Sequence, residues 1–323
     1  MTPAASSRET ESAPLENLHA PQPVGPLEAE VQAPWERALV GVFIAAPLLA
    51  LCAAVPVAWG WGLSWRDVVI AAVLYVITGF GITVGYHRHF THGSFKAPRP
   101  VRIALGIAGS MALEGPIVRW VADHRKHHQY SDREGDPHSP WKYGRSPLGL
   151  ARGLLHAHMG WMFDRERTSR RRYAPDMLAD RDVMWMSRLF PLWVALSLLL
   201  PAAVGSLWSW SWQGALTAFF WGGLVRIGLV HQVTWAVNSV CHVFGKQQFK
   251  TRDRSTNVWW LALPSFGESW HNLHHAEATS ARHGVLRGQL DPSARLIRIM
   301  ERLRLARDVR WPDPARIAAK RIA

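Results

Sequence analysis

Residues 38–59 read ALVGVFIAAPLLALCAAVPVAW, the first long apolar run of the chain. It contains no charged side chain, and it exceeds the about 20 residues that a helix needs to cross the hydrocarbon core of a bilayer. Pro47 and Pro56 would break a soluble helix, but membrane helices tolerate proline because neighbouring groups satisfy the freed backbone atoms. The stretch therefore predicts a transmembrane helix.

Three further apolar segments have the length of membrane helices, at residues 67–86, 189–208 and 214–237. Short turns join the first helix to the second and the third to the fourth. The apolar segment 101–113 is too short to cross and indicates a re-entrant or interfacial helix. Four crossings with two tight turns would place all remaining long segments on one side of the membrane.

Those remaining segments, residues 87–188 and 238–310, form a predicted cap. They carry nearly all Lys and Arg, whereas the opposite turns carry little beyond Arg66 and Asp67. The positive-inside bias then places the cap in the cytoplasm, at the inner membrane if the source is bacterial. We predict an all-α integral membrane protein with four transmembrane helices and a cytoplasmic helical cap. Residues 1–34, rich in Pro, Ala, Ser and Glu, are expected to form a disordered tail, and residues 311–323 a C-terminal tail.

The composition agrees with this fold. Hydrophobic residues make up 48% of the chain, and it contains 18 Trp, a residue that concentrates at membrane interfaces. The net charge of +13 comes from Arg and Lys in loops beside apolar runs, so it favours an anionic lipid leaflet or an acidic headgroup and argues against a nucleic-acid partner. Two cysteines, Cys52 and Cys241, signal neither a disulfide framework nor a zinc–thiolate site.

Histidines gather in four clusters: HRHFTH at 87–92, HRKHH at 124–128, NSVCH at 238–242 and HNLHH at 271–275. A lone histidine is usually a surface or hydrogen-bonded residue, but helical residues three and four apart share a face, as in the second and fourth clusters. Three of the clusters are built like ligand sets. Neutral imidazole binds iron, copper, zinc and nickel, and nine imidazoles exceed what one ion can take. Two metal ions are therefore predicted, with nine candidate ligands: His87, His92, His124, His127, His128, His242, His271, His274 and His275.

The clusters resemble the histidine boxes of the membrane fatty-acyl desaturase family, most closely its Δ9 acyl-CoA desaturase branch. The segments YSDREGDPH at 130–138 and HMGW at 158–161 are also similar to that branch, and the resemblance runs from the first span to about His283. It implies a di-iron centre bound by the nine histidines above. It also implies that Asn238 reaches one metal through water, whereas His89 is not a ligand.

The resemblance implies that the chain introduces a cis double bond into a long saturated acyl chain, with O2 as co-substrate. Unactivated methylenes require a redox metal that activates O2, and zinc has no redox chemistry. The expected substrate is a fatty acyl thioester, acyl-CoA at Δ9, with its tail in a bent tunnel between the helices. Electrons are expected from a separate donor protein, of ferredoxin or cytochrome type, with an NAD(P)H reductase.

The candidate substrate residues, in the tunnel or at the headgroup, are Trp120, Trp141, His158, Trp161 and Arg226. Interfacial packing is the alternative for the tryptophans, and structural hydrogen bonding is the alternative for Arg226 and His231 within the fourth span. Two other functions stay open. A related di-iron membrane hydroxylase or monooxygenase would insert oxygen instead, and a metal transporter would place ionisable groups in mid-membrane instead of past the span ends.

Overall fold

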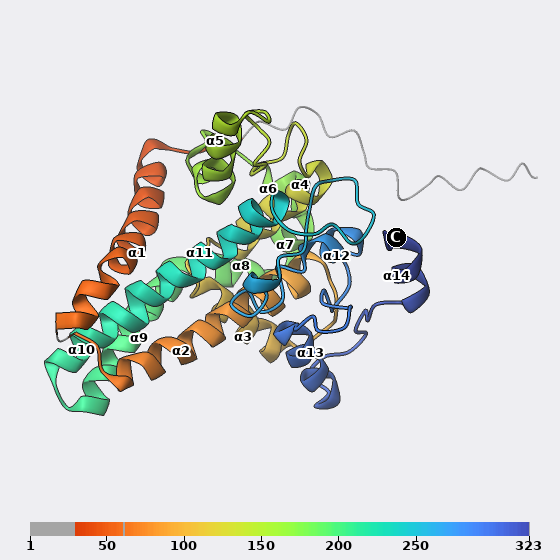
Figure 1. Cartoon of the computed structure of the whole chain (residues 1–323). Helices are drawn as coiled ribbons and strands as arrows, with labels where there is room; N and C mark the ends of the chain where they lie inside the picture. The colour runs from red at the N-terminus through yellow and green to blue at the C-terminus, as the bar shows by residue number, and fades with distance from the viewer. Residues whose placement is uncertain (1–29, 61, 323) are drawn as a thin grey trace, which may run out of the picture.

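The computed structural model describes residues 30–60 and 62–322, and their regular structure is almost entirely helical. Four helical segments are long and apolar enough to cross a membrane, which confirms the number of predicted spans. Figure 1 shows that one of them, α1, diverges from the others toward one end of the molecule. The four segments are Pro34–Gly60, Trp65–Thr91, Phe190–Ser209 and Trp212–His242.

Two of the four segments contain both α-helix and π-helix. The second segment begins with a capping box: the Ser64 side chain accepts from the Asp67 backbone N–H, and the Asp67 carboxylate accepts from the Ser64 backbone N–H. Pro47 and Pro56 lie inside the first segment without ending it. The segments consist of α1 (Pro34–Gly60), α2 (Trp65–Phe80) with the π-helix η1 (Gly81–Thr91), α9 (Phe190–Ser209), and α10 (Trp212–Ala218) with the π-helix η3 (Phe219–Val225), α11 (Arg226–Ser239) and the 3-10 turn η4 (Val240–His242).

The cap consists of short helices between and after the spans. Its two-stranded sheet pairs β1 (Glu30–Val31) with β2 (Glu166–Arg167) in antiparallel register. The cap helices are α3 (Arg99–Ser110), α4 (Ile117–Tyr130), α5 (Pro147–His158), η2 (Gly160–Phe163), α6 (Arg170–Tyr173), α7 (Pro175–Ala179), α8 (Arg181–Arg188), η5 (Trp259–Leu261), α12 (His271–Ala276), α13 (Pro292–Arg302) and α14 (Pro314–Lys320).

Helix α3 occupies most of the segment in which the sequence predicts a short re-entrant or interfacial helix. It packs against η1 at a distance that only glycine permits: a Cβ atom on Gly81 would lie 2.2 Å from the backbone nitrogen of Gly109. After α3, Leu113 and Gly115 both adopt positive φ angles, of 62° and 102°, and turn the chain into α4. This close packing and the turn after it bring α4 beside η1, where both helices carry histidine.

The predicted tails need correction at both ends. Residues 1–29 of the predicted N-terminal tail lie outside the described residues, but from Glu30 onward the chain is structured, because strand β1 pairs with β2. The predicted C-terminal tail, 311–323, contains helix α14, and Arg316 and Lys320 each form an ion pair with Glu277 at 2.7 Å. Alternating charge and apolar residues in so short a segment give too weak a signal to predict this docking.

Candidate metal centre

The nine predicted histidines come together in two groups. In the first, five side chains from η1, its C-terminal cap, α4 and α12 place one ring nitrogen each within 4.8 Å of one another. In the second, four side chains from α4, η4 and α12 do the same. The five-histidine group is His87, His92, His124, His128 and His274, and the four-histidine group is His127, His242, His271 and His275.

Helices α4 and α12 each supply both groups. In α4, His124 and His128 belong to the five-histidine group and His127 to the four-histidine group. In α12 the assignment is the opposite: His271 and His275 belong to the four-histidine group, and His274 belongs to the five-histidine group. Residues four apart lie one above the other on a helix, and the third lies to one side. The two helices therefore hold the groups next to each other.

Buried carboxylates fix the orientation of four of these imidazoles. Nδ1–H of His127 donates to Asp136 at 3.0 Å, that of His242 to Asp132 at 2.9 Å and that of His275 to Asp253 at 2.7 Å. Nδ1 of His87 contacts Glu268 in the same way. A carboxylate on Nδ1 leaves Nε2 as the free lone pair, which is the usual support for a metal-binding histidine. In all four cases the supporting carboxylate lies outside the helix that carries the histidine.

The inner nitrogens of the groups fit a metal ion. Nε2 of His271 lies 3.1 Å from Nε2 of His242 and 3.0 Å from Nε2 of His275, whose Nδ1 atoms both donate to carboxylates. With the proton on Nδ1, the Nε2 lone pairs of His242 and His275 both point toward Nε2 of His271. A cation between these nitrogens would stabilise this arrangement. Two nitrogens bound at about 2.1 Å and at right angles to one ion lie about 3 Å apart. The donor set of neutral imidazoles suits iron, copper or zinc.

Burial favours the neutral, metal-binding form of six of these imidazoles. The pKa values of His92, His124 and His128 are well below the usual histidine value, because burial disfavours the charged ring and the neighbouring imidazoles add to the effect. Burial lowers the pKa values of His271, His274 and His275 in the same way. Because a metal binds only the unprotonated nitrogen, these six ligands need to release few protons before a metal binds.

We expect Asp136→Asn to weaken metal retention by about 10–100-fold, because loss of the carboxylate removes the group that fixes the tautomer of His127. The measurement is metal content after a timed exposure of the purified protein to a chelator. Asp182→Asn is the matched control, since Asp182 on α8 is half-buried, pairs with the exposed Arg99 and contacts no histidine of the two groups. Equal metal retention by the two variants would contradict the supporting role of Asp136.

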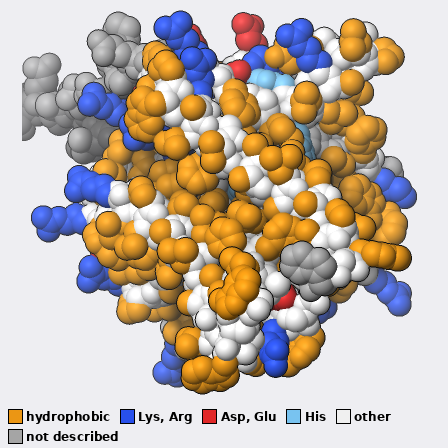
Figure 2. Space-filling model, turned by 90° about the vertical axis from the view of Figure 1, so that its left-hand side faces the viewer, with side chains coloured by type: hydrophobic (Ala, Val, Ile, Leu, Met, Phe, Trp, Pro, Cys, Tyr) orange, Lys and Arg blue, Asp and Glu red, His pale blue; other side chains and the backbone are white. Residues whose placement is uncertain are grey.

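A cavity of about 1090 Å³ leads to the two groups. Its wall is formed by α1, α2, α9 and α11, and it reaches His87 and His124 of the first group and His271 of the second. Hydrophobic side chains cover the face of the molecule on which α1 lies, with Lys and Arg at its edges (Figure 2). The cavity is at the upper end of the usual range for small-molecule sites, about 300–1,000 Å³, and is thus large enough for a long apolar ligand.

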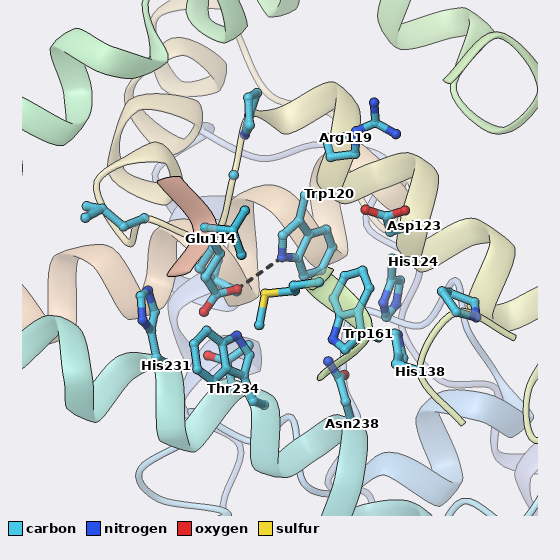
Figure 3. A pocket seen from close by; sticks show the side chains of 18 of the residues that line it. Glu114, Arg119, Trp120, Asp123, His124, His138, Trp161, His231, Thr234 and Asn238 are labelled. Carbon is cyan, nitrogen blue, oxygen red and sulfur yellow. Dashed lines mark hydrogen bonds between the residues drawn. The ribbon is translucent and has the colours of Figure 1, made fainter. Parts of the chain in front are cut away.

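Two predicted substrate residues line the cavity. Trp120 stacks on the His124 ring, with ring centroids 5.0 Å apart, and its Nε1–H donates to Glu114 at 3.1 Å. Figure 3 shows Glu114 and Trp120 side by side, with Trp161 and Asn238 on the same cavity. Burial raises the pKa of Glu114 to about 7, so near neutral pH a large share of this carboxyl group is uncharged. Neither its burial nor its contact with Trp120 had a signal in the sequence.

The other three predicted substrate residues do not line this cavity, and their role stays a prediction. His158 bonds to Gln232 and Ser239 of α11. Arg226 is buried and donates to backbone carbonyls of Met111, Ser197 and Gly222, which supports the structural alternative. Trp141 is half-buried: its ring contacts the Arg254 guanidinium and its Nε1–H donates to the His242 carbonyl. The cavity lining contains none of them.

Asn238 lies four residues before His242 on α11 and lines the cavity together with His124 and His271. Its place beside the four-histidine group, which is one ligand smaller than the other, agrees with the predicted water-mediated role, which stays a prediction. His89 bonds to the Phe95 carbonyl and belongs to neither group. Sequence reasoning missed the supporting groups around the site, which are Arg88, Asp132, Asp136, His138, Asp253, Glu268 and His283.

Comparisons with known proteins agree with this site. Residues 63–283 match the model of the family described as fatty acid desaturase. The chain is 38% identical over 279 residues to a hex-5-enoyl-[acyl-carrier protein] acetylenase of Moorena producens, covering 86% of this chain and 87% of the relative. It is 37% identical over 261 residues to an sn-1 stearoyl-lipid 9-desaturase of Synechocystis, covering 80% and 76% of the two chains.

A third relative is delta-9 acyl-lipid desaturase 1 of Arabidopsis thaliana, which is 35% identical over 291 residues, covering 87% of this chain and 88% of the relative. The family match extends over all four histidine clusters and both histidine groups. With its four membrane-spanning segments, its two histidine groups and its apolar cavity, the chain belongs to the fatty acid desaturase family.

Proposed function

We propose that the chain is an O2-dependent fatty acyl desaturase that introduces a cis double bond at Δ9 into a long saturated acyl chain, with two iron ions bound by the nine histidines and, through water, by Asn238. One observation carries the proposal. The cavity is lined by His87 and His124 of one histidine group and His271 of the other, so a single acyl chain would meet both groups.

The proposed reaction combines a –CH2–CH2– unit, O2, two electrons and two protons into –CH=CH– and two waters. When bound, the two irons would supply the oxidising power that unactivated methylenes require, with O2 as the oxidant. The protein supplies position: the cavity walls exclude water from the acyl chain, and Trp120 stacks against His124 where the cavity reaches the five-histidine group. Glu114 fixes this indole ring by accepting its N–H.

We infer that the acyl chain arrives as acyl-CoA. Arg119, Lys126 and Arg167 line the same cavity as the apolar residues and fit the phosphates of such a headgroup. The names of the relatives refer to acyl chains on an acyl-carrier protein and on lipids, and these carriers also bear phosphate or lie in the membrane. Purified protein given the same acyl chain on CoA, on acyl-carrier protein or in a glycerolipid separates the three. A dominant rate with either of the other carriers would replace the acyl-CoA assignment.

We propose a membrane location and an electron donor for the enzyme from its spans and loop charges. The charge distribution of the loops supports a cap that faces the cytoplasm, where soluble electron carriers and acyl thioesters are present. The membrane-spanning segments make membrane lipid a constant neighbour of the protein. We propose that the two electrons come from a separate carrier protein with an NAD(P)H reductase.

Expression of the chain in a desaturase-deficient host should produce new monounsaturated fatty acids, with the double bond between carbons 9 and 10. Mass spectrometry of the extracted acyl chains locates the bond. His128→Ala should abolish the new product, because its Nε2 lies 2.8 Å from that of His274 within the five-histidine group.

Immunodetection in the membrane fraction shows whether the variant is inserted. A hydroxylated product would instead establish the hydroxylase or monooxygenase reaction. A triple bond, as the name of the Moorena relative suggests for that protein, would require a correction of the product while leaving the site assignment unchanged. Unaltered unsaturation in inserted His128→Ala would contradict the proposed metal role.

A further inference from the structure

The loop between η4 and η5 contacts the four-histidine group from outside. Asp253 accepts from Nδ1 of His275 at 2.7 Å. The backbone N–H of Arg254 donates to Asp132 at 2.8 Å, and the same carboxylate oxygen accepts from Nδ1 of His242 at 2.9 Å. The loop therefore contacts His275 directly through the Asp253 carboxylate, and it is linked to His242 through the Asp132 carboxylate. Gly245, with a φ of 121°, makes the turn that starts the loop.

The outer side of this loop is cationic. Lys246, Lys250 and Arg252 are exposed, and the half-buried Arg254 lies beside them. Residues 243–258 contain a single acid, Asp253, and its carboxylate points inward to His275. None of these four cations forms an ion pair with a carboxylate of the described residues. Lysine and arginine side chains without a neighbouring carboxylate attract an acidic partner from a distance.

Two residues from the segment that follows α4 extend this surface. Arg133 donates to the backbone carbonyl of Arg252 at 3.3 Å. Trp141 is half-buried, with the Arg254 guanidinium 4.3 Å from its ring centroid. We name the set Arg133, Trp141, Lys246, Lys250, Arg252 and Arg254 the cationic loop face. Glu134, next to Arg133, lies in a separate pocket with Lys126 and Arg172. Figure 1 shows α4, α12 and the end of α11 meeting in this part of the cap.

Trp141 connects the cationic loop face to the metal centre. Its Nε1–H donates to the backbone carbonyl of His242 at 3.1 Å, while its ring contacts Arg254. Tryptophan and arginine are the residues that most often anchor protein–protein interfaces. No member of the face lines the cavity, whose lining includes Arg119 and Arg167 on other segments. A protein bound here would therefore leave the acyl site open.

We propose that the cationic loop face is the docking site of an acidic one-electron carrier protein of the ferredoxin class. The inference rests on the proposed desaturase function, in which an external donor supplies two electrons per turnover. The carrier docks twice, and each time it loses one electron and the centre gains one. Asp253 and Asp132 would separate the bound carrier from His275 and His242 by one side chain each.

The test uses the full-length, iron-loaded protein in lipid nanodiscs and a plant-type [2Fe–2S] ferredoxin as the probe. The variant carries Lys250→Glu and Arg252→Glu, which reverse two exposed charges without touching a histidine or its carboxylate. The control carries Arg171→Glu and Arg181→Glu, two exposed cations on α6 and α8. Measurements are ferredoxin affinity by titration, its dependence on salt, and the rate at which reduced ferredoxin is oxidised in stopped flow.

We expect the variant to lose at least about tenfold in affinity and in oxidation rate at low salt, with a shallower salt dependence, while the control stays close to the unmodified protein. Dithionite with a small mediator should reduce the variant and the unmodified protein equally, which shows that the centre is intact. Equal ferredoxin affinities in variant and unmodified protein would overturn the proposal, and so would an equal loss in the control. Ferredoxin binding that depends on this face, in a protein that forms no double bond, would support the docking site and refute the proposed function.

Discussion

His274→Ala is expected to abolish desaturation and to lower the bound iron below two ions per chain. Nε2 of His274 lies 3.0 Å from that of His87 and 2.8 Å from that of His128, so it connects ligands from η1 and α4. Loss of a supporting residue outside the ligand set costs about 10–100-fold in metal affinity or activity, and the loss of a ligand should exceed this. The measurements are iron per chain by elemental analysis and product formed per unit time.

His89→Asn is the matched control for this prediction. His89 lies in the same cluster as His87 and His92, but its Nδ1 contacts the Phe95 carbonyl at 3.1 Å, and an asparagine amide can donate to that carbonyl. We expect two irons per chain and activity within about tenfold of the unmodified protein. If both variants lost iron equally, the division of the first cluster into ligands and non-ligands would be wrong.

Arg88→Ala is expected to destabilise the fold far more than the loss of an exposed arginine does. Arg88 is fully buried and forms ion pairs with Glu268 at 3.1 Å and Asp291 at 3.0 Å, in addition to a bond to the Ala281 carbonyl. Its removal leaves two buried carboxylates without their cation, for which the typical cost is about 3–5 kcal/mol. Glu268 also contacts His87, so iron should be lost together with stability.

The measurement for Arg88→Ala is the thermal unfolding midpoint of the detergent-solubilised protein, followed by circular dichroism. Arg99→Ala is the control, because the side chain of Arg99 is 73% exposed and its ion pair with Asp182 is screened by solvent. We expect the midpoint of the control to match that of the unmodified protein. A midpoint of Arg88→Ala as high as that of the control would show that the buried ion pairs do not stabilise the fold.

The spans and the histidine groups were predictable because both depend on local sequence. An uncharged run such as 38–59 has few alternatives to a membrane helix, and the spacing of His124, His127 and His128 fixes their relative directions on any helix. Because the chain crosses the membrane four times with two tight turns, all histidine clusters were expected on the same side of the membrane. The division into five and four could not be predicted, because it depends on how α4 and α12 are rotated against each other.

Contacts between distant segments account for what the sequence did not reveal. Asp253 and Glu268 support His275 and His87 across 22 and 181 residues of chain, and no local pattern marks such a partner. Trp141 was a candidate tunnel or headgroup residue, and its partners, the Arg254 guanidinium and the His242 carbonyl, lie more than 100 residues away in the sequence. Glu114 escaped notice because an acid after an apolar helix normally faces water.

Because α4 and α12 each contribute to both histidine groups, neither site can be built or dismantled alone. A small rotation of one helix changes the geometry of both histidine groups at the same moment. The pair should consequently fill as a unit, with a first ion that orders the ligands for the second, so that partially loaded protein is scarce at equilibrium. When less iron is supplied than the protein can bind, we expect a mixture of empty molecules and molecules with two ions.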